Sequence, residues 1–426
     1  MNFLSTLKSI FKLKDLRKRI IIVLILVVIA RIFAAIPIPG IDKEQIANYF
    51  NNNEAFSLLN IFTGGGLENF SLALMGVGPY ITASIIFQLL VVVIPRLEEM
   101  QKESEAGRKK INQLTRIATV PLSFLQSFGT ITLLKQQQVI SNITTYDFIL
   151  MLVFSTAGTM ILMWLGELIS EQGIGNGLSI IITIGILSAI PSQIAQTAQS
   201  YISGDLKFIL GIIGFLIIAV LILVVIIYIS EGVRKIPISY TRHIRGGGFG
   251  NVGNHLPIKV NAAGVIPIIF AISLIVFPPV IAQFFENAKS AFIADSAVFI
   301  KNLFENQIFY GVMYFVLVFG FTFFYTFIIF KPDQIAENLQ KQGGFIPGIR
   351  PGKETEDYLY IVINRLTLAG AIFLGIIAVL PIVVQNVTDI STLKLGGTSL
   401  LIIVSVTLET IRQIRAQIIS RTYELS

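Results

Sequence analysis

The residues best suited to bind another molecule surround Arg350, in a segment rich in Gly and Pro. This segment reads Gly-Phe-Ile-Pro-Gly-Ile-Arg-Pro-Gly from Gly344 to Gly352. Gly and Pro favour tight turns, and a guanidinium group carries five N–H donors that suit a carboxylate or a phosphate. The sequence therefore predicts a stiff loop that presents one cation to an acidic partner.

A second basic segment surrounds a run of glycines at 246–250. Its cations are Arg234, Lys235, Arg242 and Arg245. No strand pattern precedes the run and no Lys-Ser or Lys-Thr pair follows it, so the other parts of a phosphate-binding loop are missing. These cations are predicted to dock a partner, although the general excess of basic residues on one side of a membrane also accounts for them.

Other site chemistry is sparse in this chain. It has no Cys and only two His, which excludes disulfides, thiolate chemistry and Cys-ligated metals. We expect no metal, no cofactor and no catalytic residue, and the sequence has no nucleotide-binding motif.

The elements that position these loops are long apolar stretches. Hydrophobic residues make up 54% of the chain and charged residues 13%, where soluble domains have about a quarter charged. Most stretches reach the roughly 20 residues that a helix needs to cross a bilayer, although the fifth and tenth are short. They are 20–36, 72–94, 117–134, 148–165, 178–190, 208–229, 262–282, 308–330, 366–384 and 398–411.

Basic residues predict the orientation of these spans. Most of the 32 Lys and Arg residues fall before the first stretch and after the second, sixth, eighth and tenth. Because such residues stay on the cytoplasmic side, both the N-terminus (1–19) and the tail (412–426) are predicted to be cytoplasmic. The first stretch resembles a signal peptide, but its length and the membrane domain after it favour a retained span.

The predicted fold is an all-α polytopic membrane protein with ten transmembrane helices. Five spans per half would give two halves of opposite topology, 20–190 and 208–411, joined outside the cell by a hinge connection, 191–207. The large cytoplasmic loops would be 231–259 and 331–357. Anionic lipid is a natural counterpart for the net charge of +7.

The second and seventh spans begin alike. Gly78-Pro79 and Gly264-Val265-Ile266-Pro267 both place Gly and Pro near a span start, where the helical hydrogen bonds are loosened. Each could be an ordinary membrane proline, but the pair at corresponding places favours two mobile walls of a central path. Before the second span, 55–70 is too short to cross a membrane and is either a surface helix or a re-entrant piece.

The span centres contain no Asp, Glu, Lys or Arg. Ion-coupled carriers usually keep such a group at the membrane midplane, whereas aliphatic constrictions seal a pore by dewetting. The pattern favours a gated pore for large cargo. Any one aliphatic residue could equally be packed or face lipid.

Five motifs then indicate a family. The chain resembles the SecY/Sec61-alpha family of protein-conducting channels over essentially its whole length. The motifs are Gly78–Ile86, Gly173–Gly177, Lys259–Pro267, Lys341–Gly352 and Gly396–Leu401.

The resemblance implies two halves that close like a clamshell on an hourglass channel. A ring of aliphatic side chains narrows its waist, with a plug on the outer side and a lateral gate between the second and seventh spans. By position the ring is Val77, Ile81, Ile182, Ile186, Ile269 and Ile402. The short re-entrant plug helix holds Phe56, Leu58, Leu59, Ile61, Phe62, Gly64 and Gly65. The polar gate residues are Thr82, Gln88 and Asn261.

The resemblance also implies the partners. Arg350 matches a loop arginine that couples the channel to the SecA ATPase, and Arg234 to Arg245 would dock SecA or the ribosome. SecE and SecG subunits, signal peptides, secretory polypeptides and lipids are expected partners, with YidC and SecDF as further candidates. Two departures are Val77, where Ile is more usual, and the low charge of 246–254.

The expected function is a passive channel in the bacterial cytoplasmic membrane, driven by SecA or by translation. It would conduct unfolded secretory proteins and release transmembrane segments into lipid. Two alternatives remain open from the sequence: a secondary transporter with a five-plus-five inverted repeat, and an insertase that works without a pore.

Overall fold

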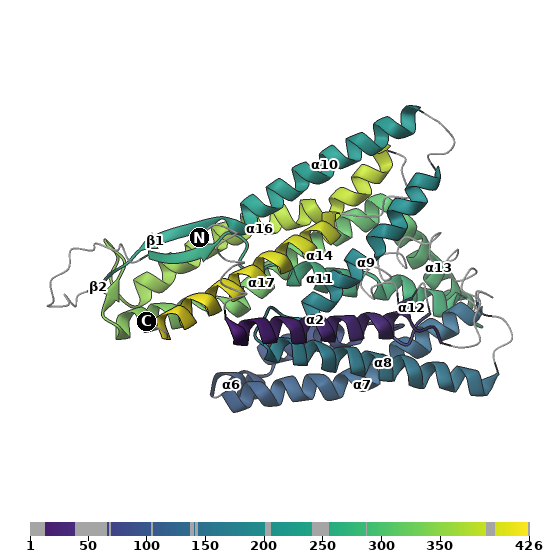
Figure 1. The fold of residues 1–426 in the computed structure, drawn as a ribbon, viewed down its shortest axis with the longest axis horizontal. Coiled ribbons are helices and arrows are strands. Elements are labelled where there is room, and N and C mark those ends of the chain that lie inside the picture. Colours follow the sequence, from purple (N-terminus) through teal and green to yellow (C-terminus); the bar gives the residue numbers. More distant parts are fainter. Residues whose placement is uncertain are drawn as a thin grey trace.

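The computed structural model describes residues 13–38, 66–67, 70–103, 105–136, 140, 144–200, 206–240, 255–286, 288–388 and 397–424. Within these ranges the chain is mostly helical, as the sequence predicts. Most helices run lengthwise through the molecule (Figure 1).

The first half of the chain contributes helices only. They are α2 (Lys14–Ala35), α5 (Gly78–Val93), α6 (Pro95–Glu103), α7 (Glu105–Gln136), α8 (Thr145–Glu171) and α9 (Gly177–Ser200). Helices α5 and α6 meet at a bend of 105°, so α6 turns away from the direction of the bundle.

The second half contains eight helices and four short strands in its described residues. The helices are α10 (Leu206–Glu231), α11 (Ile266–Ile275), α12 (Phe277–Phe285), α13 (Ala291–Glu305), α14 (Gln307–Ile329), α15 (Pro332–Lys341), α16 (Lys353–Thr388) and α17 (Gly397–Glu424). The strands are β1 (Val233–Pro237), β2 (Ser239–Tyr240), β3 (His255–Lys259) and β4 (Gly344–Phe345).

Every predicted span coincides with helix. Five helical segments in the described residues are long and apolar enough to cross a membrane, or six if the bent α5–α6 pair is one span. The fifth and tenth stretches, which looked short, lie in the longer helices α9 and α17. Helices α9 and α10 also extend into the predicted connection 191–207.

Three features differ from the sequence prediction. Strands β1 and β2 precede the glycine run at 246–250, where the sequence showed no strand pattern. The seventh stretch is divided into α11 and α12, and α13 follows in the connection before the eighth stretch. Helix α13 mixes Asp295, Lys301 and Asn302 with its apolar residues, so its hydropathy does not reach that of a span. Amphipathic composition of this kind escapes a search for continuous apolar runs.

The starts of α5 and α11 share one backbone geometry. Gly76 has a φ of 54° and Gly264 a φ of 66°, values that glycine adopts without a steric penalty. Val77 and Val265 follow as N-caps with φ of −95°, and a proline occupies the first turn of each helix. The repeat that the sequence suggests is thus a repeated backbone turn.

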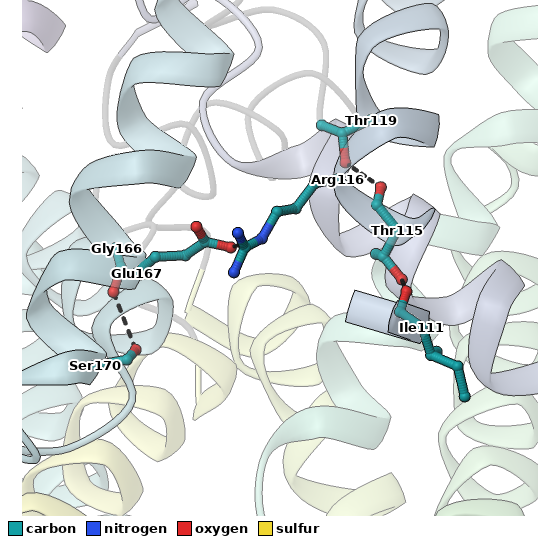
Figure 2. A network of polar contacts seen from close by, with 7 residues as sticks. All are labelled: Ile111, Thr115, Arg116, Thr119, Gly166, Glu167 and Ser170. Atoms are coloured by element: carbon teal, nitrogen blue, oxygen red, sulfur yellow. Dashed lines mark hydrogen bonds and ion pairs between the residues drawn. The ribbon is translucent and has the colours of Figure 1, made fainter. Parts of the chain in front are cut away.

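Helices α7 and α8 are joined by polar contacts as well as by packing. The Arg116 guanidinium forms an ion pair with the Glu167 carboxylate near one end of the helix pair (Figure 2). Further along, the hydroxyls of Ser127 and Ser155 lie 2.7 Å apart and are fully buried. Small polar residues allow membrane helices to approach closely and to bond across their interface.

Different elements lie at the two ends of the molecule (Figure 1). One end, here called the strand end, holds β1–β4, the C-terminal end of α17 and the start of α2. The other end holds α12 and α13. The predicted cytoplasmic loops 231–259 and 331–357 therefore lie together at the strand end, as far as they are described.

Gly158 of α8 provides a test of this packing. A Cβ atom at this position would overlap the carbonyl oxygen of Leu72. The backbone of Leu72 is held in place, because the Leu72 N–H donates to Ile36 O at 3.0 Å. We expect Gly158→Ala to lower the free energy of unfolding by roughly 1–3 kcal/mol, as overpacking does. Thermal unfolding of the purified protein in detergent measures this. Gly320→Ala in α14 is the control, because no atom lies within 4 Å of its Cβ position, and equal stability of both variants would contradict the packing.

Candidate functional site

The six predicted ring residues lie in one buried hydrophobic cluster. They come from four helices of both halves: α5 or its N-cap, α9, α11 and α17. None is more than 8% exposed. They are Val77, Ile81, Ile182, Ile186, Ile269 and Ile402. The described members of this cluster are aliphatic and aromatic, so the centre of the bundle is closed by apolar packing where the two halves meet.

Helices α5 and α11, the predicted gate pair, are in contact. On α5, Thr82 donates from its hydroxyl to Gly78 O at 3.1 Å and accepts from Gln126 of α7 at 3.4 Å. Gln88 donates to the Ser84 hydroxyl at 3.2 Å. The polar groups of α5 therefore bond within α5 and toward α7.

The Asn261 side chain hydrogen-bonds to the backbone of the turn that leads into α11. Its side-chain oxygen accepts from the N–H of Gly264 at 3.0 Å, and its amide nitrogen donates to Gly264 O at 3.4 Å. The side chain is 8% exposed. This local bonding fixes the positive-φ turn at Gly264, which sets the direction in which α11 begins.

At the strand end, the two basic loops form one structure. Strands β1 and β3 pair as an antiparallel hairpin, while β2 pairs with β4 from the other loop. Side chains from both loops and from α16 share a buried cluster beneath the strands. Its members, here called the loop core, are Ile236, Ile258, Ile346, Leu359 and Ile363.

The loop core supports the exposed cations. Arg234 and Lys235 lie on β1 with exposed side chains, opposite Ile258 and Pro257 of β3. Arg350 is exposed in the turn after β4, between Gly348 and Gly352, whose φ values are 83° and 101°. The turn is anchored by the Thr355 hydroxyl, which donates to Arg350 O at 2.8 Å. Arg350 therefore lies exposed in an anchored turn, and its role in docking a partner stays a prediction.

Lys259, at the end of β3, lies close to other charges. Burial, with the Arg412 charge nearby, lowers the pKa of the Lys259 ammonium, while Glu409 and Glu231 oppose this shift. Arg412 of α17 pairs with Glu231 of α10 at 2.7 Å and also donates to Ser230 O at 3.0 Å. These charges therefore lie where the hairpin approaches the end of α10 and the middle of α17.

Several predicted site residues lie outside the described residues. They are the plug residues Phe56, Leu58, Leu59, Ile61, Phe62, Gly64 and Gly65 and the basic residues Arg242 and Arg245. At the end of the plug segment 55–70, Phe70 is buried and its carbonyl oxygen accepts from the N–H of Ile38 at 2.9 Å. Across the described ranges, no group of three or more His, Cys, Asp and Glu could hold a metal ion.

Comparison with known proteins identifies the family. The SecY family model matches residues 71–411. This chain belongs to the SecY family. A protein translocase subunit SecY from Halalkalibacterium halodurans is 42% identical over 98% of both chains, and that of Bacillus subtilis is 41% identical over 98% of both.

Solved structures support the same fold for this SecY-family chain. One titled as a protein-conducting channel has a TM-score of 0.65 at 20% identity and covers 93% of this chain and 91% of its own. Sec61 in a canine ribosome-channel complex has a TM-score of 0.63 at 20% identity, with the same coverage of both chains. The all-α polytopic fold is thus confirmed.

One polar contact of this SecY-family chain was missed by sequence reasoning. Side chains of α17 bond to the loop 172–177 between α8 and α9: the Gln417 amide donates to Gly173 O at 2.6 Å, and the Gly175 N–H donates to Gln413 at 2.8 Å. The spaced glycines at 173, 175 and 177 were the available signal, but they do not reveal their partner.

The loop core gives a testable prediction for this SecY-family chain. Leu359 is fully buried, so Leu359→Ala should cost roughly 2–5 kcal/mol of local stability and loosen the β2–β4 pairing. Hydrogen exchange of the β4 amides measures the loss of protection. Tyr360→Ala is the control, because the Tyr360 side chain is 51% exposed. Unchanged β4 exchange in Leu359→Ala would show that the two loops do not depend on this core.

Proposed function

We propose that this chain is the pore-forming subunit of a protein translocase in the bacterial cytoplasmic membrane. It conducts unfolded proteins that carry a signal peptide and releases their transmembrane segments sideways into lipid. The observation that carries the proposal is the buried aliphatic cluster at the meeting of both halves. Family membership supports it, because the curated relatives are named as translocase subunits.

A channel of this kind is not an enzyme, so a partner must supply the energy. SecA hydrolyses ATP and the translating ribosome elongates the chain; either drives the polypeptide through. Ribosome contact is supported by the neighbouring fold titled as Sec61 in a ribosome-channel complex. SecE and SecG complete the translocase, and YidC and SecDF are further partners.

The ring closes the pore without any specific cargo site. Water leaves a narrow passage lined by aliphatic side chains, so ions do not cross it. The same side chains bend around different polypeptide segments because they make no directional bonds. Val77, Ile81, Ile182, Ile186, Ile269 and Ile402 are assigned to this ring, with the plug segment 55–70 beneath it on the outer side.

The α5–α11 contact is the proposed lateral gate. Both helices start at a positive-φ glycine followed by a first-turn proline, which leaves their starts less restrained than a continuous helix. Thr82, Gln88 and Asn261 are the polar residues that tune the gate. An apolar signal segment in the gate would exchange aliphatic contacts for similar ones, so opening requires little net energy.

The strand end is the proposed docking surface in the cytoplasm. Exposed Arg234, Lys235 and Arg350 lie there on the shared loop core. The start of α2 and the C-terminal end of α17 point toward the same end of the molecule (Figure 1). Arg242 and Arg245 extend the same basic loop. Both chain termini are then cytoplasmic, in agreement with the distribution of basic residues.

Polar substitution in the ring tests the constriction. Ile269→Asn should let water enter the waist and relax selectivity, so that precursors with defective signal sequences are exported several-fold faster than by the unchanged channel. Export into inverted membrane vesicles measures this. Leu274→Asn, on an exposed part of the same helix, is the control. If Ile269→Asn rejects defective signal sequences normally, the ring assignment is wrong.

Charge reversal tests the docking surface. Arg350→Glu should impair SecA-driven export by roughly tenfold or more, because the anchored turn would present an anion where the motor needs a cation. Lys353→Glu reverses an exposed cation at the start of α16, close to the same turn, and should have a smaller effect. Wild-type export by Arg350→Glu, at equal channel abundance, would refute the role of this residue.

A further inference from the structure

The loop 172–177 is held from the opposite half of the molecule by two glutamine side chains of α17. Gln417 donates to the carbonyl oxygen of Gly173 at 2.6 Å, and Gln413 accepts from the N–H of Gly175 at 2.8 Å. Both bonds join the first half of the chain to its last helix. We refer to Gln413, Gln417 and the loop 172–177 as the latch.

The loop has a backbone shaped for this close contact. Gly173 and Gly175 have φ values of 71° and 76°, which other residues adopt only with strain. A Cβ on Gly173 would lie 2.8 Å from Gln417 Nε2, and one on Gly175 would lie 2.7 Å from the Thr410 hydroxyl. From the first half, Arg19 donates to Gln172 O at 3.2 Å, so the loop is held on both sides.

The latch connects two helices that carry ring residues. Helix α9 begins at Gly177, the last residue of the loop, and carries Ile182 and Ile186, while α17 carries Ile402. Helices α9 and α17 are also in contact with each other. The two halves thus meet at a bonded edge, α9–α17, and at the α5–α11 contact, where both helices contribute aliphatic side chains to the central cluster.

We infer that Gln413 and Gln417 fix the α9–α17 edge as the hinge, so that separation of the halves is confined to the α5–α11 edge. Directional hydrogen bonds are lost when their partners move apart, whereas an apolar face can exchange one apolar neighbour for another. Hinge opening needs one edge of this kind to stay in place. This inference rests on the proposed function, because it takes the α5–α11 contact as the side that opens.

Two pairs of spin labels on the Cys-free chain test the inference in the complete translocase. One pair, Glu171→Cys with Ala416→Cys, reports the latch edge, and the other, Ile86→Cys with Leu274→Cys, reports the gate edge. All four positions are exposed. Distances are measured with the channel idle and with a stalled secretory precursor engaged by SecA and ATP. We expect the gate distance to lengthen by several ångströms and the latch distance to stay unchanged.

In the double variant Gln413→Leu/Gln417→Leu, the latch distance should lengthen when the precursor is engaged. The control variant is Arg415→Gln, which changes an exposed residue in the same turn of α17 and should behave like the unchanged chain. Lengthening of both distances in the unchanged chain would overturn the hinge and leave the channel function intact. A double variant that behaves like Arg415→Gln would also overturn it. A gate distance that never lengthens with precursor engaged would instead refute the lateral gate itself.

A different observation concerns the other end of the molecule. An apolar cavity of about 560 Å³ lies between α11, α12, α13 and α14 and is partly open to the outside. Ser296 is the one polar residue of its lining, and its hydroxyl donates to Phe292 O at 2.7 Å within α13. The cavity therefore offers no free side-chain hydroxyl with which to orient a polar ligand.

The surroundings of the cavity match a lipid-facing surface. Leu274, Ile281 and Met313, which line it, are 47%, 51% and 38% exposed and belong to segments apolar enough to cross a membrane. Helix α13 forms the far wall and is tied to the end of α12, because Lys301 donates to both oxygens of Glu286 at 3.0 and 3.2 Å. The opening is thus continuous with the face that contacts lipid.

We propose that this cavity holds one acyl chain of a bilayer phospholipid. Its volume lies within the roughly 300–1,000 Å³ of small-molecule sites, but such sites normally carry a few polar groups that fix their ligand. An alkyl chain needs no polar group to bind. Packing against the aromatic and aliphatic lining favours its place in the cavity over its place in the fluid bilayer.

Native mass spectrometry of the channel extracted from phosphatidylglycerol nanodiscs tests this site. Ser296→Trp, at an exposed lining position, would fill the cavity, and Val316→Trp on an exposed face of α14 is the control. We expect Ser296→Trp to retain one phosphatidylglycerol fewer than the unchanged chain and Val316→Trp to retain the same number. Ser296→Phe repeats the test with a smaller side chain. Equal retention by all four proteins, each monodisperse after extraction, would overturn the proposal.

Discussion

The interior of this protein must be sealed by side chains that make no directional bonds, because any fixed charge at the centre would hold water or an ion there. The central cluster meets this constraint with aliphatic and aromatic residues from both halves. Its members come from α5, α9, α11 and α17, among other helices, so this cluster is also the interface of the two halves. An apolar interface of this type can separate and close again, since it loses packing but leaves no polar group without a partner.

Several polar contacts between segments lie outside this cluster. Ser127 and Ser155 join α7 to α8, Gln413 and Gln417 hold the loop 172–177, and Arg412 bonds to Glu231. Because such bonds require defined geometry, they keep neighbouring helices in register. The molecule thus combines rigid edges, which hydrogen bonds define, with an apolar centre whose contacts can be exchanged.

Sequence patterns predict the parts of this fold that depend on local composition. Each of the ten apolar runs coincides with a helix for all or most of its length, and the Gly-Val-x-Pro repeat before α5 and α11 marks a backbone turn that both helices share. The motifs also place the six ring residues in one buried cluster. Their role as a constriction and the roles of Thr82, Gln88 and Asn261 stay predictions.

Contacts between distant segments are what the sequence does not reveal. The β2–β4 pairing, which joins two loops that were treated as separate docking sites, depends on two residues from each. Helix α13 mixes charged and apolar residues and lacks a continuous run. The partners of Gly173 and Gly175 lie more than 200 residues away in α17. These features depend on how distant segments pack in the folded chain. Periodicity and composition describe local sequence only and do not reveal such packing.

The most direct test of the account is to ask whether moving polypeptide touches the ring. Since the chain has no Cys, a single Cys at Ile81 reports that position alone. With a stalled precursor carrying one Cys, SecA and ATP, we predict a disulfide at Ile81→Cys that requires ATP and a functional signal sequence. Val153→Cys, on an exposed face of α8 away from the gate pair, should give little or none. If an engaged precursor forms no disulfide with Ile81→Cys, the result would contradict the account. The aliphatic residues of the ring would then serve only in packing.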